Sequence, residues 1–400
     1  MRLSDIAYYV DDNISSDCIE LNQYITTDNL LQNKEGRILA SNLPPKACNL
    51  THFLPGDVLI ANIRPYLKKV WKADIEGGCS KDVLVIRPKE GHNADYLYSV
   101  ALQDAFFDNA MLGNKGTQMP RGDKNKIMDL PILEQTDKEA YIGKIISEIQ
   151  EKISLNTRMN AELEAMAKQL YDHWFVQFDF PFDFAQGKPD ENGKPYKSSG
   201  GKMVWNEKLK REIPEGWEDS TLSKIANITM GQSPDGSTYN TNGIGMVFYQ
   251  GSTDFGIRFP SVRMFTTNPT RFASKGDILM SVRAPVGDTN IANENCCIGR
   301  GLSALNSKIG STTHLYHILS DLKAKFDQLN AAGTTFGSIT KDEMYSLPVV
   351  KPSSEVLKSY EDICYPMFEK QMNIGYEINR LTNLRDSLLP MLMNGQVTIE

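Results

Sequence analysis

A loop in the first third of the chain carries side chains that could contact the edges of nucleic-acid bases. Its polar members are Lys115, Thr117, Gln118, Arg121 and Lys124, and glycines between them would let the backbone approach a ligand closely. Glutamine can bond to both edge atoms of adenine, arginine can do the same with guanine, and lysine binds phosphate. The pattern predicts a DNA-contacting loop, with an ordinary solvated surface loop as the alternative.

A second set of residues repeats this pattern later in the chain. The corresponding loop holds Thr334, Thr335, Ser338 and Lys341. This second loop therefore has more hydroxyl side chains and fewer basic side chains than the first loop. Two further pairs of basic residues occupy matching places: Arg64 and Arg283 each follow a predicted strand, and Lys81 aligns with Arg300. We expect these residues to form one DNA-facing surface in each half of the chain.

An internal duplication accounts for the matching positions. Residues 3–7 are similar to 222–226, and residues 56–60 are similar to 276–280. The Gly-Thr pair at 116–117 and the Leu-Pro pair at 130–131 recur with the same spacing at 333–334 and 347–348. These signals occur in one order at a nearly constant interval. In each copy, short β-branched runs bounded by Gly and Pro predict strands, and residues 96–108, which match 315–329, predict a helix. Each copy is therefore expected to be a mixed α/β head.

Each head is followed by a stretch whose apolar residues recur at steps of three and four, the period of an amphipathic helix. The first stretch opens with Thr136 and Glu139 at capping-box spacing. Both apolar stripes are too narrow for a helix that is buried on all sides, so the two helices are expected to pair. The residues expected at the contact between the helices are Ile146, Ile149, Ile153, Leu163, Leu170, Ile363, Met367, Ile374, Leu381 and Leu388.

The expected fold class is α+β, with two mixed α/β heads in tandem, each followed by a long helix, and the two helices pairing as an antiparallel coiled coil. The expected boundaries are 1–133 for the first head, 134–175 for the first helix, 176–212 for a linker, 213–352 for the second head, and 353–400 for the second helix and tail. A solvated linker is expected because Gly, Pro, Lys and Ser dominate residues 186–202. Pro390 and Gly395 are expected to stop the second helix.

Composition and charge limit the class of protein. With 40% hydrophobic and 23% charged residues among 400, the chain is ordinary for a globular protein and long enough for several cores. Its six cysteines match no metal-ligand spacing and suit the reduced thiols of a cytoplasmic protein, and no apolar run has the length of a membrane span.

The distribution of charge is more informative than its sum. The net charge of −7 does not by itself favour nucleic acid, but bases outnumber acids in residues 53–89, 113–126 and 258–283, whereas both long helices are acidic. Basic heads suit binding to phosphate, and acidic helices suit binding to protein.

Motifs for catalysis or cofactor binding do not emerge from the sequence. Residues 200–202 resemble a phosphate loop, but Tyr196 and Met203 break its pattern. His314 and His317 share a helix face without a third metal ligand in place, so they are expected to be structural. Cys296 and Cys297 are expected in the core. Since motifs for S-adenosylmethionine and for methylation of a flipped base are also missing from the sequence, we expect neither catalysis nor a cofactor in this chain.

The order head, helix, head, helix resembles the specificity (S) subunit of type I restriction-modification systems. The resemblance rests on residues 116–118 with 130–135, on 166–175, on 213–218 and on 384–390, and it covers essentially the whole chain. The order and duplication of these segments carry it more than any single motif. The chain departs from the family pattern at two places. Residues 347–352, which join the second head to its helix, lack the Glu-Gln that stands at 134–135 after the first head. The first head also lacks the Pro-Glu-Gly-Trp segment that precedes the second head.

This resemblance implies two target recognition domains, each reading one half of a gapped sequence in double-stranded DNA. The helices would form a coiled coil that sets the gap and docks methyltransferase (M) subunits, two in number, and translocase-nuclease (R) subunits would join that core. S-adenosylmethionine, ATP and Mg²⁺ would belong to those partners. The chain itself would be a non-catalytic, cytoplasmic, DNA-binding subunit.

Two alternatives accompany this interpretation. The nearer one is the specificity chain of another bipartite restriction system, or a silent donor of recognition domains. The other is a protein-interaction scaffold built on the coiled coil, with heads that bind protein. Salt-dependent DNA binding would separate the scaffold from the DNA-reading proteins.

Overall fold

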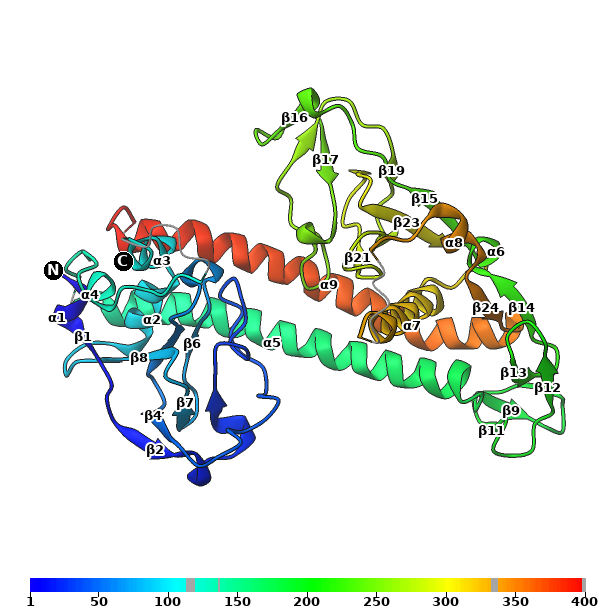
Figure 1. The fold of residues 1–400 in the computed structure, drawn as a ribbon, viewed down its shortest axis with the longest axis horizontal. Helices are drawn as coiled ribbons and strands as arrows, with labels where there is room; N and C mark the ends of the chain where they lie inside the picture. Colours follow the sequence, from blue (N-terminus) through cyan, green and yellow to red (C-terminus); the bar gives the residue numbers. More distant parts are fainter. Residues whose placement is uncertain (113–118, 136, 332–336, 398–400) are drawn as a thin grey trace. The chain divides into compact units, whose positions relative to one another are not determined.

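A computed structural model describes residues 1–112, 119–135, 137–331 and 337–397 of the chain (Figure 1). The chain divides into two compact units, Met1–Asn156 with Glu377–Glu400 (unit 1) and Thr157–Tyr376 (unit 2). Each unit contains one predicted head together with parts of both long helices. The architecture is mixed α/β with long helices, as the sequence predicts.

The first sheet of unit 1 has its strands in the order β1-β8-β5-β6, all antiparallel to their neighbours. The strands are β1 (Ala7–Tyr9), β8 (Val83–Pro88), β5 (Val58–Ala61) and β6 (Val70–Lys72). The helices packed with it are α1 (Leu3–Ile6), α2 (Ala94–Leu102), α3 (Asp104–Ala110) and α4 (Lys124–Met128). Because side chains alternate along a strand, Val58 and Ile60 pack with these helices, whereas Leu59 and Ala61 pack with a second sheet.

That second sheet has the strand order β2-β4-β7-β3, in which β3 and β7 run parallel. Its strands are β2 (Asn13–Ser15), β4 (Asn49–Phe53), β7 (Gly77–Cys79) and β3 (Tyr24–Ile25). Short 3₁₀ turns connect the strands of unit 1 at η1 (Ser16–Cys18), η2 (Leu21–Gln23) and η3 (Pro65–Leu67). The head of unit 1 is therefore two sheets with helices on the outer face of the first.

The head of unit 2 repeats this arrangement. Its first sheet has the order β15-β23-β20-β21, again antiparallel throughout. The strands are β15 (Ala226–Met230), β23 (Leu302–Ser307), β20 (Ile278–Ser281) and β21 (Thr289–Ile291), and the helices are α6 (Leu222–Ile225), α7 (Thr312–Ala331) and α8 (Lys341–Ser346). Strand for strand this order matches β1-β8-β5-β6, so the duplicated sequence segments occupy equivalent places in the two heads.

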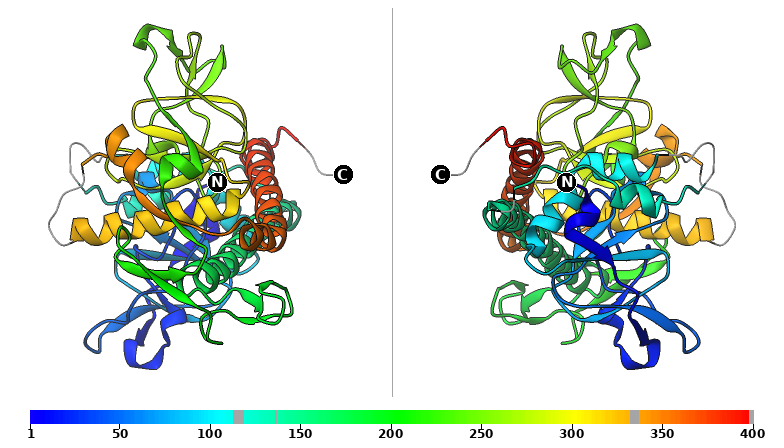
Figure 2. Two further views of the ribbon diagram at one scale, coloured as in Figure 1. Left: turned by 90° about the vertical axis from the view of Figure 1, so that its right-hand side faces the viewer. Right: turned by 90° about the vertical axis from the view of Figure 1, so that its left-hand side faces the viewer.

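The second sheet of unit 2 has the order β16-β18-β17-β22-β19, with β17 and β22 parallel, and it shares a core with the first sheet. The green segment that contains β16 and β17 projects from this core (Figure 2). The strands of this second sheet are β16 (Tyr239–Asn240), β18 (Phe265–Thr266), β17 (Met246–Tyr249), β22 (Cys296–Ile298) and β19 (Phe272–Ala273), with 3₁₀ turns η5 (Gly236–Thr238) and η6 (Ser252–Asp254). As expected, Cys296 and Cys297 are core residues in β22, and burial raises the pKa of Cys296 to about 12.

Residues 176–212, expected as a solvated linker, are folded into short strands, although most of residues 186–202 are exposed. They form β9 (Pro181–Asp183), β10 (Lys188–Pro189), β11 (Lys194–Pro195), β12 (Met203–Asn206) and the start of β13 (Arg211–Pro214), followed by β14 (Glu218–Thr221), which pairs with β24 (Pro348–Lys351). Phe180 stacks on Tyr196 at 4.7 Å and on Trp217 at 5.2 Å between ring centroids. Burial of these aromatic rings offsets the entropy lost by ordering a Gly- and Pro-rich segment.

The long helices are α5 (Glu139–Tyr171), continued by one π-helical turn (Asp172–Val176), and α9 (Ser354–Met393). Thr136 of the predicted capping box lies outside the described residues. Pro390 does not stop α9, since the helix continues to Met393 before Gly395 turns the chain with a φ of +67°.

The predicted contact residues on the helices differ in burial. Ile146, Ile153 and Ile374 are buried, and Ile149, Leu163, Leu170, Met367, Leu381 and Leu388 are partly buried. The prediction that Ile363 is buried at the contact between the helices is wrong, because this residue is 41% exposed. In this part of α9 the buried residues are Tyr360, Cys364 and Phe368, which pack with the head of unit 2 and thereby turn Ile363 outward.

A carboxylate of each long helix contacts the start of a helix in the head. In unit 1, Glu139 accepts hydrogen bonds from the backbone N–H of Asn93 at 3.1 Å and pairs with His92 Nδ1 at 2.9 Å, just before α2. In unit 2, Glu361 accepts from the backbone N–H of Thr312 at 3.2 Å and from the hydroxyl of Ser311, at the start of α7. These bonds satisfy N–H groups that a helix start leaves without partners, and they join head to helix.

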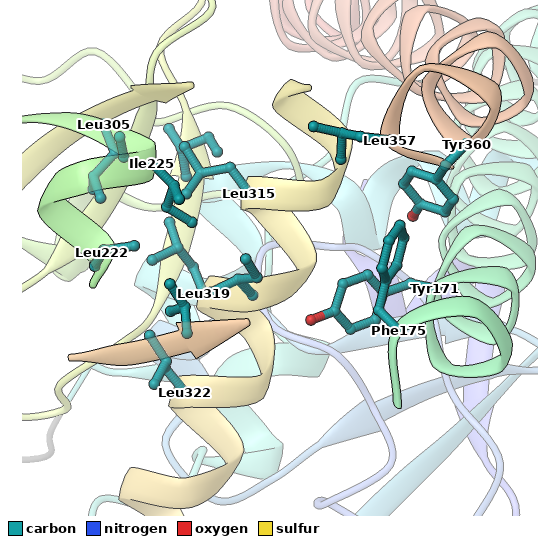
Figure 3. Close-up of a cluster of buried hydrophobic side chains, with 14 of the residues drawn as sticks. Tyr171, Phe175, Leu222, Ile225, Leu305, Leu315, Leu319, Leu322, Leu357 and Tyr360 are labelled. Atoms are coloured by element: carbon teal, nitrogen blue, oxygen red, sulfur yellow. The ribbon is translucent and has the colours of Figure 1, made fainter. Parts of the chain in front are cut away.

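Helix α7 is buried between two groups of side chains (Figure 3). Leu315, Leu319 and Leu322 lie toward Leu222, Ile225 and Leu305, and Tyr171, Phe175 and Tyr360 lie on the other side of the helix. His314 and His317 belong to this second side, 4.5 Å from the ring of Phe175 and 5.3 Å from that of Tyr171 respectively. Both histidines are 2% exposed, and burial lowers the pKa of each to about 3.

Because these two histidines are buried, we predict that the free energy of unfolding of unit 2 decreases in acid. Their folded pKa lies below the value of about 6.5 in an unfolded chain, so the unfolded state binds more protons as the pH falls. Their stabilising effect is complete above about pH 6.5 and is lost progressively toward pH 3, by up to about 1.4 kcal/mol per pH unit for each histidine. In urea unfolding of the full chain at several pH values, His314→Leu with His317→Leu should flatten this dependence, whereas His52→Gln should not. An equally steep dependence in the double variant would contradict the assignment.

Candidate nucleic-acid interface

In unit 1 the backbone brings three loops together beside the end of β5. The N–H of Arg64 donates to the carbonyl of Pro120 at 2.8 Å, and the N–H of Asn62 donates to the carbonyl of Asp82 at 2.8 Å. Ile63 and Arg121 form an isolated β-bridge. Arg64, Lys81 and Arg121, which the sequence places far apart, therefore occupy one exposed edge, here called the first basic edge.

The side chains of the first basic edge differ in their partners. Arg121 Nη2 forms an ion pair with Asp82 Oδ1 at 3.0 Å, in which the side chain of Arg121 is 66% exposed and that of Asp82 is 38% exposed. Arg64 and Lys81 have no ion pair with another residue of the described ranges. Arg64 also has a φ of +53°, a left-handed conformation that a residue before proline rarely adopts. Backbone strain of this kind is common at binding sites, and here it accompanies an exposed guanidinium.

Unit 2 forms an equivalent edge from the equivalent loops. The N–H of Val282 donates to the carbonyl of Gly301 at 2.9 Å, and the N–H of Ile339 donates to the carbonyl of Val282 at 3.0 Å. Arg283 and Ser338 form an isolated β-bridge, as Ile63 and Arg121 do in unit 1. Arg283, Arg300 and Ser338 are all exposed and define the second basic edge.

The remaining predicted contact residues fall into two groups. Lys124 and Lys341 each begin a short helix next to an edge and lie over a tyrosine ring, that of Tyr9 at 5.6 Å and that of Tyr345 at 5.2 Å. Lys115, Thr117, Gln118, Thr334 and Thr335 lie outside the described residues.

Two polar residues next to Arg300 were missed by the sequence reasoning. Gln232 is held beside β22 by its N–H, which donates to the carbonyl of Ile298 at 3.0 Å. Gln250 follows β17, which runs parallel to β22, so it emerges at the same end of the sheet as Arg300. Both glutamines are exposed. Their signal in the sequence is the glycine beside each, at Gly231 and Gly251, but neither matches a position of the repeat that had been singled out.

The geometry offers hydrogen-bond donors and positive charge rather than a reaction centre. Within the described ranges, no group of three His, Cys, Asp or Glu side chains is placed to hold a metal ion. None of the helices in those ranges is both long enough and apolar enough to span a bilayer. Exposed arginine, lysine, glutamine and serine on a loop edge can bond to phosphate oxygens and to base edges.

Comparison with known proteins supports the resemblance predicted from the sequence. Residues 214–359 match the family model described as the type I restriction modification DNA specificity domain. A specificity subunit of the type I restriction enzyme MjaX from Methanocaldococcus jannaschii is 41% identical over 193 residues, which cover 47% of this chain and 45% of that protein. This chain thus spans about half the length of that relative.

Two further similarities extend over most of the chain. The type I restriction enzyme MjaIX specificity subunit of the same organism is 22% identical over 373 residues, covering 89% of this chain and 81% of that protein. The crystal structure of a type I restriction-modification system S subunit from M. genitalium shares the fold, with a TM-score of 0.58 at 14% identity and coverage of 100% and 96% of the two chains. The resemblance to the specificity (S) subunits of type I restriction-modification systems is therefore confirmed as a similarity, which the family model finds over residues 214–359 and the second relative over most of the chain.

Proposed function

We propose that this chain is the non-catalytic subunit that selects the DNA sequence in a type I restriction-modification complex. In this proposal each head reads one half of a gapped, bipartite target in double-stranded DNA. The two target recognition domains are residues 1–133 and 213–352, and each is followed by its long helix, 134–175 or 353–400.

The observation that carries the proposal is the repetition of the basic edge. The same three loops meet in both heads, through the bridge of Ile63 with Arg121 in one and of Arg283 with Ser338 in the other. The residues at the two edges differ, with Arg121 in the first where Ser338 stands in the second. A common frame with different side chains is what two readers of different half-sites require.

We further propose that the helices pair as an antiparallel coiled coil. In unit 1, the amide of Gln135 donates to the carbonyls of Leu392 and Met393, Arg385 Nη1 donates to Gln150 Oε1 at 2.7 Å, and Asn156 Nδ2 donates to Glu377 Oε2 at 2.9 Å. In unit 2, Gln371 Nε2 donates to Glu164 Oε2 at 2.9 Å. Positions on α9 decrease as those on α5 increase, which supports the antiparallel direction.

The outer faces of the helices suit docking of protein partners. Large apolar side chains exposed there are Tyr141, Leu155, Met166, Ile363, Tyr365 and Leu384. Apolar groups on an otherwise acidic helix are typical of interaction surfaces. We assign the exposed surfaces of the helices to methyltransferase (M) subunits, with translocase-nuclease (R) subunits joining the complex, and S-adenosylmethionine, ATP and Mg²⁺ to those partners. A cytoplasmic location, without membrane attachment, is part of the same proposal.

Removal of one edge arginine should change the salt dependence of DNA binding. Arg64→Ala and Arg283→Ala each remove one phosphate-binding charge, so the slope of log affinity against log salt should decrease by about 1 in each variant. Fluorescence anisotropy of the complex with M subunits on target DNA measures this slope. Lys208→Ala, which removes an exposed lysine that pairs with Asp219 and belongs to neither edge, is the control. Unchanged slopes in both arginine variants would show that the basic edges do not contact DNA. Binding that does not depend on salt would favour the alternative of a protein-interaction scaffold.

Exchange of one head should change one half of the target. We expect replacement of residues 213–352 by the head of another specificity subunit to alter one half-site and leave the other half-site as it was. Sequencing of methylated adenines in cells that express the hybrid with its M subunit provides the measurement. Alteration of both half-sites by one exchange, in a chain that circular dichroism shows to be folded, would exclude independent reading.

A further inference from the structure

We propose that Arg258 is a positioning residue, which ties the strand that presents Arg283 to both long helices and so holds the second basic edge in a fixed orientation. The inference rests on the proposed function for its consequence in DNA recognition. Its structural part stands on contacts within unit 2 alone.

The guanidinium of Arg258 lies between the two long helices. Nη1 donates to Glu164 Oε2 of α5 at 3.3 Å, and Nη2 donates to Gln371 Oε1 of α9 at 3.1 Å. The side chain lies over the ring of Phe368 on α9 at 4.6 Å and over the ring of Tyr316 on α7 at 5.1 Å. One residue of a head loop thus contacts three helices.

The next residue of the loop strengthens this connection. The ring of Phe259 stacks on that of Tyr376 at 4.7 Å, directly above Gly375 of α9. A Cβ at Gly375 would lie 2.7 Å from Phe259 Cε2, so only glycine leaves room for the ring in this position. Glycine within a helix costs roughly 1 kcal/mol relative to alanine. Close packing of the loop against α9 accounts for its presence there.

The backbone of the same loop is bonded to the sheet that carries the second basic edge. The N–H of Ile291 in β21 donates to the carbonyl of Arg258 at 3.1 Å, and Asn290 Nδ2 donates to the carbonyl of Gly256 at 2.8 Å. Strand β21 pairs with β20, and Arg283 follows the end of β20. The path from the helices to Arg283 therefore runs through Arg258, β21 and β20.

The energetics favour a positioning role over a role in stability. Arg258 is 7% exposed, and its Nε has no hydrogen-bond partner among the described residues, nor do the side-chain atoms of the neighbouring Asn160. Burial of a charge with incomplete bonding costs free energy that well-packed apolar side chains would not. What the guanidinium adds is direction, because its planar fork fixes the angle between its acceptors on two helices.

The test compares Arg258→Met with Arg263→Met in the complex of the full chain with its M subunits. Arg263 is the matched control, since it bonds to Asp254 and Thr253 within the same head. Methylation rates are measured on the natural target and on targets whose half-sites stand one base pair closer or farther apart. We expect Arg258→Met to reduce the discrimination between these spacings about tenfold, the value of one charged hydrogen bond, with both half-sites unchanged. Arg258→Lys, which retains the charge without the fork, should restore part of it.

A second readout requires no DNA. Hydrogen exchange at the amide of Ile291 should accelerate in Arg258→Met and remain as in the wild type in Arg263→Met. If Arg258→Met does not fold, Glu164→Gln, which removes the charge but conserves volume, should show both effects to a smaller degree.

Wild-type spacing discrimination together with wild-type exchange at Ile291 would overturn the proposal. So would an equal loss of activity on all spacings, because Arg258 would then serve the fold of the head or its affinity for DNA. If the wild-type complex methylates no bipartite target, the proposed function fails, and the exchange at Ile291 still decides whether Arg258 holds the strand.

Discussion

The structure depends on one interaction that occurs in both units, a carboxylate of a long helix bonded to the start of a helix in the head. Glu139 is 3% exposed, and a buried carboxylate is tolerated only when donors surround it. The donors are the N–H of Asn93 and the ring of His92 in unit 1, and Thr312 and Ser311 provide them to Glu361 in unit 2. Gly143 of α5 allows the same approach, since a Cβ there would lie 2.5 Å from the backbone nitrogen of Tyr96.

Repetition extends from this joint to the helices and to the basic edges. Gln150 bonds to Arg385 in unit 1, and Gln371 bonds to Glu164 in unit 2. The sequence interval from Gln150 to Gln371 equals that from Glu164 to Arg385, so the two bonded pairs occupy equivalent positions of the repeat. A buried polar pair on apolar helices lowers stability but favours one alignment over others. The duplicated chain has therefore kept equivalent contacts at its joints while the side chains on its two basic edges differ.

Much of this arrangement could be predicted because its signals are local and occur twice. Strands β5 and β20, the long helices and the equivalence of Lys81 with Arg300 follow from short motifs at fixed spacing. The predicted equivalence of Arg64 with Arg283 is wrong by one residue, because Arg283 forms the bridge that Ile63 forms in unit 1. The burial of Ile363 was predicted wrongly because a helical stripe does not reveal which residues pack on a head. The folding of residues 176–212 was not predicted, because a composition rich in Gly and Pro indicates a linker even where alternating aromatic residues such as Phe178 and Phe180 are buried. Arg258 could not be predicted at all, since a single arginine in a loop has no pattern that indicates two acceptors on distant helices.

In the proposed function, this chain determines which DNA sequence its partner subunits methylate. The most direct measurement is single-molecule sequencing of methylated adenines in cells that express the M subunit with and without this chain. We expect one methylated motif that depends on the chain, with two short specific halves separated by a fixed number of unspecified base pairs. Methylation that is the same without the chain, or a chain-dependent motif without a gap, would contradict the proposed function.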